Sequence, residues 1–310
     1  MDFIEAAREI VGRANVLTGD DTQRFASDWT GKYSAMPLGV VRPGTTAEVS
    51  ALMALASGTA TPVVPIGGNT GLSGGAHAPD AVLLSLERMK TIRDIRPEAR
   101  VAIVEAGVVL ERLHEATAEH GLTFPMTFGA KGSATIGGAM ATNAGGSNVL
   151  RYGNTRALVL GLEAVMPDGA VMDLMGALHK DNSGYDLKDL LIGAEGTLGI
   201  ITAAVVKLVP LPRAYVTAIV SLATLDDALL LLNRVQEATG NAVEACEYMP
   251  GAYLDALERL RPETRRPLGR HDVNVMLEIG ASAARDAVPG ADGVTPLAAL
   301  LEALLGEELE

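Results

Sequence analysis

The residues that could carry chemistry begin with a glycine-rich run, PIGGNTGLSGG, at positions 65–75. Gly67, Gly68 and Gly71 allow positive φ angles and a close approach of the backbone to a ligand. Successive N–H groups in such a loop can converge on one anion. The run contains no lysine or arginine, so backbone dipoles would supply most of the attraction, which suits a diphosphate. A loop that needs glycine only for tight turns is the alternative interpretation.

Two familiar phosphate-binding motifs are absent from this run. The Walker loop ends in Gly-Lys followed by Ser or Thr, and the Rossmann fingerprint needs a strand, GxGxxG and then a helix. Here the expected strand Thr61–Ile66 leads through the loop to another expected strand, Val82–Leu86. The sequence therefore predicts that the phosphate sits without a helix N-terminus beside it.

Two further glycine-rich segments have little charge. The segment from Gly129 to Gly153 offers hydroxyl and amide groups among small residues, at Ser133, Thr135, Thr142 and Asn143. Small residues let a flat aromatic ring system lie against the backbone. The segment Gly193–Thr202 places a glycine-flanked acid at the start of a strand. Together the three segments indicate a long, largely buried cofactor with a diphosphate in its middle.

Hydrophobic periodicity, caps and turn signals predict the elements that position these loops. We expect helices over 3–14, 47–58, 110–120, 188–193, 225–238, 252–260 and 296–309. Thr46 is the expected N-cap of the second helix and Gly58 its terminator. We expect strands over 38–42, 61–66, 82–86, 101–106, 157–166, 170–174, 200–208, 215–222, 242–249 and 272–280. The turn Pro167-Asp168-Gly169 predicts a hairpin between two of them.

A boundary is expected at Pro210 and Pro212, where the pattern changes to alternating strands and helices. The last predicted helix carries an apolar face that needs a sheet to cover it, and only three strands precede it in this region. Either the helix docks as a terminal cap, or the chain lacks its continuation. We expect the second.

Composition excludes several classes of protein. The 310 residues include 25 Lys and Arg against 38 Asp and Glu, a net charge of −13, which argues against phosphate-neutralising nucleic-acid binding. The single cysteine, Cys246, excludes a disulfide framework, a cysteine zinc site and an iron–sulfur cluster. The chain has no charge between Glu48 and Asp80, but prolines and glycines interrupt this stretch well before the ~20 apolar residues of a membrane span. We expect a cytoplasmic protein, either free or peripheral to a membrane.

Four motifs follow one another along the chain: PIGGNTGLSGG, TIGGAMATNAGGSNVLRYGNTRALVLGLEAVMPDG, KDNSGYDL and GAEGTLGIIT. They resemble the vanillyl-alcohol-oxidase (PCMH) type of FAD-binding domain, and within it the D-lactate, glycolate and D-2-hydroxyglutarate dehydrogenases. The resemblance runs from about Ala14 onward. It implies an α+β fold: an N-terminal helix and following segment at 1–34, a two-subdomain FAD-binding domain at 35–212, and the incomplete first part of an α/β substrate domain at 213–310.

The resemblance also implies which residues hold FAD. Residues 65–71 would wrap the diphosphate, 129–135 and 142–145 would contact the flavin, ribityl and diphosphate portions, and 195–201 would contact the flavin and adenosine ends. The candidate residues are Pro65, Ile66, Gly67, Gly68, Asn69, Thr70, Gly71, Leu72, Gly132, Ser133, Thr135, Gly138, Thr142, Asn143, Gly145, Glu195, Gly199, Ile200 and Ile201. Some family members attach the flavin through histidine, and Asn69 and Thr70 stand where one branch has that histidine. We therefore expect non-covalent FAD.

The activity implied is oxidation of a D-2-hydroxy acid to the 2-oxo acid, with hydride transfer to flavin N5 and an unidentified electron acceptor. Full members carry a His-x-Gly-Asp-Gly-Asn-type segment that this chain lacks, so no catalytic base and no metal ligand is assigned. The chain is interpreted as a fragment or a shortened homologue. The alternatives are a catalytically silent flavin-binding subunit completed by a partner chain, and another oxidoreductase of the superfamily. A homodimer or a partner subunit stays open.

Several other polar residues have structural interpretations that outweigh functional ones. The five histidines form no HxxxH metal pair, and His77 is the one placed beside the first glycine loop. Trp29, Lys32 and Tyr33 match the family's leading segment. The remaining polar groups in or beside the flavin motifs are Lys131, Arg151, Lys180 and Asn182.

Overall fold

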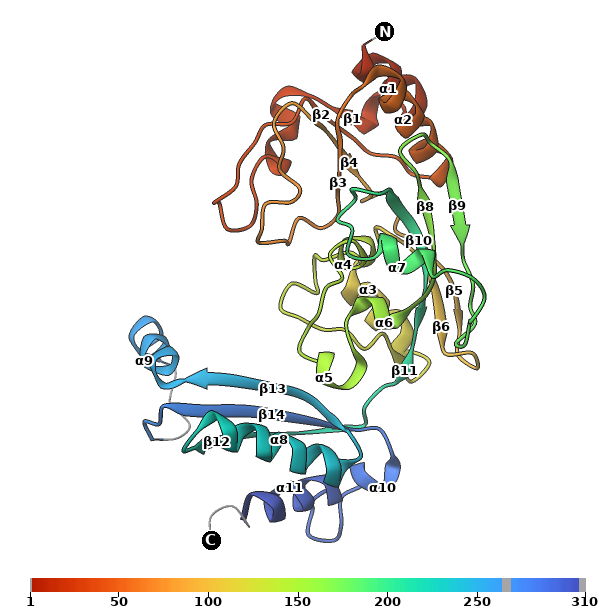
Figure 1. Cartoon of the computed structure of the whole chain (residues 1–310). Coiled ribbons are helices and arrows are strands. Elements are labelled where there is room, and N and C mark those ends of the chain that lie inside the picture. The colour runs from red at the N-terminus through yellow and green to blue at the C-terminus, as the bar shows by residue number, and fades with distance from the viewer. Residues whose placement is uncertain (1, 264–268, 307–310) are drawn as a thin grey trace. The chain divides into compact units, whose positions relative to one another are not determined.

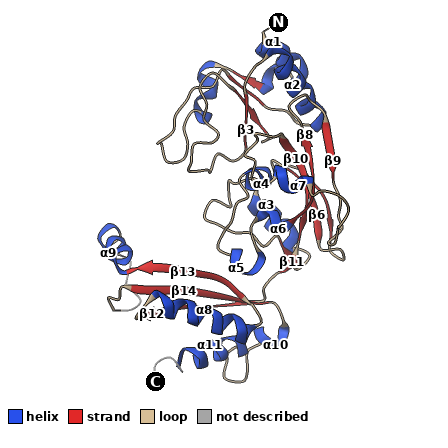
Figure 2. Ribbon diagram, viewed as in Figure 1, coloured by secondary structure: helices blue, strands red, loops and turns tan. Residues whose placement is uncertain are grey.

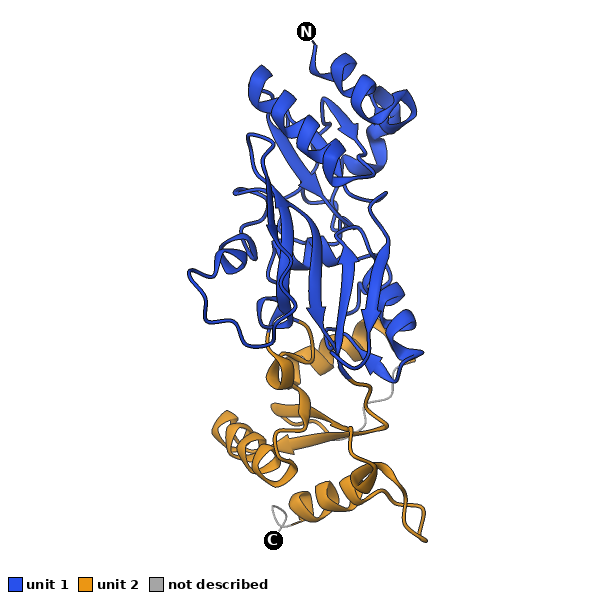
Figure 3. Ribbon diagram, turned by 90° about the vertical axis from the view of Figure 1, so that its right-hand side faces the viewer, with its two compact units in different colours: residues 1–145, 154–209 blue, residues 146–153, 210–310 orange. Residues whose placement is uncertain are grey.

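Helices alternate with separate sheets along the chain, and the computed structural model describes residues 2–263 and 269–306 (Figures 1 and 2). The expected α+β class is confirmed. The chain forms two compact units (Figure 3). Unit 1 comprises residues 1–145 and 154–209, and unit 2 comprises residues 146–153 and 210–310. Within the described ranges, no helix has both the length and the apolar character needed to cross a membrane.

The first sheet of unit 1 has four strands in the order β1-β2-β4-β3. They span Val16–Leu17 (β1), Gly39–Val41 (β2), Val82–Ser85 (β4) and Val63–Ile66 (β3). β4 lies parallel to β2 and to β3, while β1 and β2 are antiparallel. β3 is therefore an edge strand of this sheet, and the first glycine-rich loop begins at its carboxyl end.

The second sheet of unit 1 is antiparallel, in the order β5-β6-β10-β8-β9. Its strands are Ile92–Arg96 (β5), Val101–Glu105 (β6), Ile200–Lys207 (β10), Val159–Val165 (β8) and Val171–Leu174 (β9). The central strand β10 is buried along nearly its whole length, as its unbroken apolar run predicts. A short two-stranded pair joins β7 (Leu122–Thr123) and β11 (Val209–Pro210).

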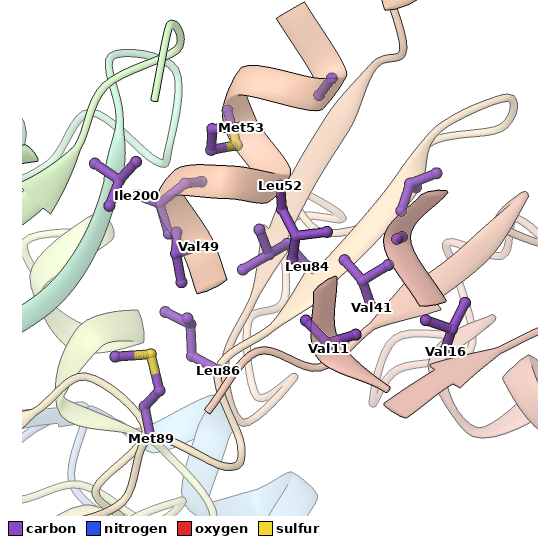
Figure 4. Packing of buried hydrophobic residues seen from close by; sticks show 14 of the residues in the cluster. Val11, Val16, Val41, Val49, Leu52, Met53, Leu84, Leu86, Met89 and Ile200 are labelled. Carbon is purple, nitrogen blue, oxygen red and sulfur yellow. The ribbon is translucent and has the colours of Figure 1, made fainter. Parts of the chain in front are cut away.

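The helices of unit 1 join these sheets. They are α1 (Phe3–Val11), α2 (Thr46–Thr59), α3 (Leu110–Ala118), α4 (Ile136–Ala141), α6 (Thr155–Leu158) and α7 (Leu187–Leu191), with 3₁₀ helices at Arg13–Asn15 and Gly19–Phe25. The core around α2 contains residues of both sheets. Figure 4 shows Leu52 beside Leu84 of the first sheet and Val49 on the side of Ile200 of the second. The two sheets are thus parts of one buried core.

Unit 2 has a three-stranded antiparallel sheet in the order β12-β14-β13. The strands are Ala214–Leu222 (β12), Val273–Ala281 (β14) and Val243–Pro250 (β13), and the helices are α5 (Val149–Tyr152), α8 (Leu225–Thr239), α9 (Gly251–Leu260), α10 (Ala284–Ala287) and α11 (Pro296–Gly306). Leu231 and Val235 of α8 and Leu297 and Leu301 of α11 pack into one core with this sheet. The last helix therefore docks on the sheet that precedes it.

Local signals placed most elements within one or two residues. α8 begins with a capping box between Thr224 and Asp227 and ends at Gly240 in the left-handed conformation. The predicted hairpin is confirmed, with β8 and β9 paired. The predicted caps of α2 were wrong by one or two residues. The N-cap is Thr45, whose side chain accepts a hydrogen bond from the N–H of Glu48. At the other end of the helix Ala60, and not Gly58, adopts the left-handed conformation. The end of the expected helix 296–309 lies outside the described residues.

Several short elements were not predicted, and two of them, β5 and α4, bear on the site. β5, with the sequence IRDIR, alternates apolar and charged residues at a sheet edge. α4, with the sequence IGGAMA, contains two glycines, each of which costs a helix about 1 kcal/mol relative to alanine. Burial of Ile136, Ala139 and Met140 offsets that cost.

A buried ionic cluster lies within unit 2. A β-bulge between Val243 and Ala245 leaves Glu244 out of the ladder with β14, and its side chain is only 1% exposed. Glu244 accepts hydrogen bonds from Arg151 at 2.7 Å, the Tyr152 hydroxyl at 3.1 Å and the Asn148 amide at 3.1 Å. Because bulges re-aim side chains, the irregularity in β13 is what directs this carboxylate toward α5.

The surroundings of the cluster leave little room. Arg151 also donates to the carbonyl oxygen of Gly280 at 2.7 Å, and a Cβ at that glycine would lie 2.3 Å from Glu244 Oε1.

Burial raises the pKa of Glu244 above its ordinary value, although Arg151 opposes the rise. Burial and the Glu244 carboxylate raise the pKa of Tyr215 to about 12.

We expect Arg151→Met to lower the free energy of unfolding by about 3–5 kcal/mol, because it leaves Glu244 buried without its cationic partner. The double variant Arg151→Met/Glu244→Leu should recover most of that loss. Urea unfolding measured by circular dichroism checks both. The control is Arg270→Met, which breaks an exposed ion pair with Asp255 and Asp272 and should change little. Equal losses for the two single variants would contradict the buried-charge argument.

The raised pKa of Glu244 predicts a pH dependence. The folded protein binds this proton more tightly than the unfolded chain, so the contribution to stability is present below the ordinary pKa of glutamate and is lost as pH rises through the raised value. Glu244→Gln should therefore flatten the fall in unfolding free energy between pH 4.5 and neutrality. Unfolding curves across that range measure it, and parallel curves for the two proteins would contradict it.

Candidate cofactor-binding site

The first two glycine-rich segments meet in direct backbone contact within unit 1. A Cβ at Gly68 would lie 2.0 Å from the carbonyl oxygen of Ser133, and one at Gly67 would lie 2.5 Å from Thr135 Oγ1. No side chain fits at such distances. Glycine at these two positions is therefore required by the packing of the loop that follows β3 against residues 133–135.

The third segment closes on the other two. A Cβ at Gly196 would lie 2.2 Å from Pro65 Cγ, and Glu195 Oε2 approaches the corresponding position at Gly75 to 3.1 Å. The N–H of Glu195 donates to the carbonyl of Ala141 at 2.8 Å, and the N–H of Gly193 donates to that of Met140 at 2.9 Å. The three segments that the sequence analysis singled out are thus brought together.

Each segment also contains one non-glycine residue in the left-handed region. These are Asn69 (φ 51°), Asn143 (φ 46°) and Glu195 (φ 51°). Asparagine adopts this conformation more readily than most residues, whereas glutamate does so rarely. The Asn69 amide donates to the carbonyl of Ser27 at 3.0 Å, and Asn143 Oδ1 accepts from the N–H of Arg156 at 2.9 Å. Strained backbone held by such contacts is concentrated at ligand sites in proteins.

The sequence analysis did not predict that a helix begins opposite the first loop. The loop does lead to β4, but α4 begins opposite it, with Thr135 as N-cap accepting from the N–H of Gly138 at 3.3 Å. Gly67 faces this turn, because a Cβ there would lie 3.6 Å from the N atom of Gly138. Sequence order could not reveal this neighbour, because α4 lies about 70 residues further along the chain.

A cavity of about 800 Å³ opens beside this contact, and we call it the glycine-loop cavity. Its lining residues are Arg24, Phe25, Gly67, Gly68, Asn69, Glu87, Lys90, Ile92, Gly107, Val108, Val109, Arg112, Ser133 and Thr135. Five of them were predicted to hold the cofactor: Gly67, Gly68, Asn69, Ser133 and Thr135. Its volume is in the range of natural ligand pockets, roughly 300–1,000 Å³.

The other predicted residues lie around the converging segments without lining this cavity. Ile66, Ile200 and Ile201 are buried, and Ile200 packs in the core around α2, so these residues present backbone rather than side chain. Leu72 is exposed on the loop, and a Cβ at Gly71 would meet nothing within 4 Å. The rest of the predicted set consists of Pro65, Thr70, Gly132, Gly138, Thr142, Asn143, Gly145, Glu195 and Gly199.

Three cationic residues of the cavity were missed by the sequence analysis. Arg24, Lys90 and Arg112 come from segments outside the glycine-rich motifs. Arg24 donates to both oxygens of Glu87 at 2.7 and 2.9 Å, and its guanidinium lies 4.3 Å from the centroid of the Phe25 ring. Nothing local distinguishes these residues from other exposed cations. Their assembly shows that backbone dipoles are not the only source of positive potential near the loop.

The remaining candidates are distributed as follows. The Tyr33 ring packs on Gly74, while Trp29 is 80% exposed. Both ring nitrogens of His77 are buried without a hydrogen-bond partner among the described residues. His114 bonds the carbonyl of Phe124 at 3.0 Å, and burial lowers its pKa. Arg151 lies in unit 2 with Glu244.

Comparison with known proteins adds three findings. Residues 37–175 match the family model of an FAD binding domain. A D-2-hydroxyglutarate dehydrogenase of Xanthomonas citri pv. viticola is 44% identical over 207 residues, which are 66% of this chain and 44% of that protein. A D-2-hydroxyglutarate–pyruvate transhydrogenase of Saccharomyces cerevisiae is 33% identical over 281 residues, covering 89% of this chain and 56% of that protein.

Among solved structures, an alkyldihydroxyacetonephosphate synthase superposes with a TM-score of 0.76 at 18% identity, covering 98% of this chain and 62% of that one. At that identity the likeness concerns the fold alone. Residues 37–175 are thus similar to the FAD binding domain family, and the expected cofactor, FAD, is confirmed. The two relatives named above act, by their names, on D-2-hydroxyglutarate. The chain spans about half the length of these relatives.

We expect Gly68→Ala to destabilise the protein by about 1–3 kcal/mol, because the new Cβ would overlap the carbonyl oxygen of Ser133. Gly71→Ala is the matched control in the same loop, since a Cβ there meets nothing within 4 Å. Thermal unfolding of the FAD-free variants measures the difference. Equal melting temperatures for the two variants would show that the contact between the loops is not a packing constraint.

Proposed function

We propose that this chain is the FAD-binding part of an enzyme that oxidises a D-2-hydroxy acid to the 2-oxo acid. The observation that carries the proposal is the convergence of three glycine-rich segments on one another, at the positions where the resemblance places FAD contacts. The similarity to dehydrogenases of D-2-hydroxyglutarate supports the substrate class. Residues 35–212 are proposed as the FAD-binding domain and 213–310 as the first part of the substrate domain.

The residues of the chain fit FAD in two respects. Gly67, Gly68 and Gly71 carry no side chain that would cover the backbone N–H groups of the loop. The N–H groups in the first turn of α4 already donate within the protein, so the loop itself would supply most of the contacts. Small residues at 142–145 leave space for a flat ring. When bound, FAD supplies a hydride acceptor at N5. Asn69 and Thr70 offer no nucleophile comparable to histidine, so the cofactor is proposed to be held without a covalent bond.

The contribution of this chain is to bind and orient. Backbone dipoles fixed by the contact between Gly68 and Ser133 would hold the diphosphate without reorganising, which is the condition for tight binding of an anion. Asn143 and Glu195 have left-handed backbone conformations. Their neighbouring N–H and C=O groups are therefore proposed to lie where the second and third glycine-rich segments meet. We assign no residue of the chain as the base that removes the hydroxyl proton. The proposed substrate to test first is D-2-hydroxyglutarate, a dicarboxylate, and the electron acceptor stays unassigned.

An absorption spectrum of the purified chain, followed by anaerobic addition of D-2-hydroxyglutarate, tests the proposal. We expect flavin bands, because the converged loops provide the site. Bleaching by the D enantiomer and not by L-2-hydroxyglutarate, with D-lactate and glycolate as comparisons, would show that the chain itself carries out the oxidation. Flavin bands that no 2-hydroxy acid bleaches would place the catalytic base outside this chain and favour a partner-dependent flavin subunit. A protein that retains no flavin after FAD is supplied would contradict the cofactor site.

A further inference from the structure

The outer edge of β12 is left unpaired by the packing of unit 2. Within the described ranges, β12 pairs with β14 on one side and with no strand on the other. The pairing with β14 runs over all nine residues, Ala214–Leu222, without a shift of register. Sheet structure therefore leaves the opposite row of backbone N–H and C=O groups open, and such a row is a template for a further strand.

Edge strands elsewhere in the described ranges carry features that block such pairing. β1 has only two residues, β3 contains Pro65, and β5 alternates with charged residues. β9 has four residues and includes Asp173, and β13 has a bulge and ends at Pro250. β12 is long and regular, and the chain has neither a proline nor a charge from Ala214 to Leu225. Its edge is therefore suited to pairing.

The apolar face of β12 is also less covered than that of the neighbouring strand. Val275, Leu277 and Ile279 of β14 are at most 2% exposed. The residues of β12 that pack against the same core are only half-buried, and they are Ala214, Val216, Ala218, Val220 and Leu222. A second apolar strand beside them would complete their burial, so the edge offers hydrophobic surface together with free backbone groups.

The charges that flank β12 indicate which strand fits it. Arg213 precedes β12 and Asp226 follows it in the first turn of α8, and both are exposed. A second β12 in antiparallel orientation would bring each of these ends toward the opposite charge. A parallel copy would bring like charges together, which is unfavourable. The strand is therefore complementary to itself in the antiparallel orientation.

We propose that β12 pairs antiparallel with β12 of a second copy of this chain, across a two-fold axis at Ala218. This register uses all nine residues and joins the two three-stranded sheets into one. On the apolar face Val216 lies opposite Val220 of the second copy, and on the other face Thr217 lies opposite Ile219. Pairs of β-branched residues stabilise antiparallel sheets, and the same patch serves both copies, as a two-fold interface requires.

Sedimentation of the purified chain and of edge variants tests the proposal. The unmodified chain should form a dimer. In Thr217→Lys/Ile219→Lys the dimer Kd should rise at least about tenfold, because the register sets like charges directly opposite one another. Thr217→Lys/Ile219→Glu should recover the dimer, because the same register then pairs opposite charges. Neither residue belongs to the apolar core of unit 2, and circular dichroism checks that each variant is folded.

The matched control is Glu247→Lys, an exposed position on β13, the other edge strand of the same sheet. It changes the net charge of the chain by the same amount as Thr217→Lys/Ile219→Lys. The Kd of the control dimer should stay within about twofold of the unmodified value, because no cross-strand pair of the proposed interface is changed.

Cross-linking tests the position of the axis. In Ala218→Cys/Cys246→Ser the Cα atoms of the two new cysteines would lie about 4.5–5.5 Å apart, within the span of a disulfide. Copper phenanthroline, which oxidises the two thiols, should yield a covalent dimer on a non-reducing gel. In Ser221→Cys/Cys246→Ser the two cysteines would be roughly 20 Å apart along the paired strands and should not cross-link.

A purified chain that is monomeric at every concentration would overturn the proposal, and an edge covered by a different polypeptide would give this result. A dimer that persists in Thr217→Lys/Ile219→Lys and does not cross-link through residue 218 would also overturn it, because another surface would then hold the copies together. None of these measurements depends on bound FAD, so their outcome is separate from that of the proposed function.

Discussion

The contact between the backbone at Gly67–Gly68 and the backbone at Ser133–Thr135 is the constraint on which the rest of unit 1 depends. It joins the edge strand of the first sheet to the start of α4, which packs on the second sheet. A contact this close excludes any Cβ, so the two glycines are set by protein packing before any ligand is considered. The N–H groups in the first turn of α4 donate within the protein, Ile136 to Val108, Gly137 to Ala106 and Gly138 to Thr135. Protein packing alone therefore satisfies this turn.

Charge is distributed unevenly around that arrangement. The chain is acidic overall, yet the cavity next to the loop contains Arg24, Lys90 and Arg112. Acidic surface elsewhere repels anions, and the three cations make the potential at this cavity more positive than on the rest of the chain. Because exposed cations are individually weak, their effect depends on being gathered at one cavity.

Unit 2 contains a buried ion pair. Glu244, re-aimed by a bulge in β13, binds Arg151 and Tyr152 of the short helix α5. Buried pairs seldom add net stability compared with apolar residues of the same shape, and their best-attested role is to fix register. Here the pair fixes residues 146–153, which directly follow the predicted cofactor-contacting residues Thr142–Gly145, within unit 2. An apolar replacement could preserve the stability without specifying the same position.

The sequence by itself determined the elements whose signals are local and the family whose motifs are contiguous. The capping box at Thr224 and Asp227, the hairpin turn at Pro167–Gly169 and the apolar run of β10 need only neighbouring residues to be read. The glycine-rich segments likewise indicated a long cofactor with a diphosphate, because the chemistry of a diphosphate loop lies in consecutive backbone groups, and the resemblance carried by the same motifs implied FAD.

Tertiary structure alone decided the features that depend on distant residues or that contradict local preference. α4 forms although IGGAMA is a poor helix sequence, because burial offsets its propensity. The pairing of Arg151 with Glu244 joins residues 93 positions apart, and the bulge that allows it leaves no local signal. The three cations reach one cavity from separate elements. Short-range patterns specify an element, but only the packed core specifies which elements meet, because that choice is made by contacts between residues far apart in the chain.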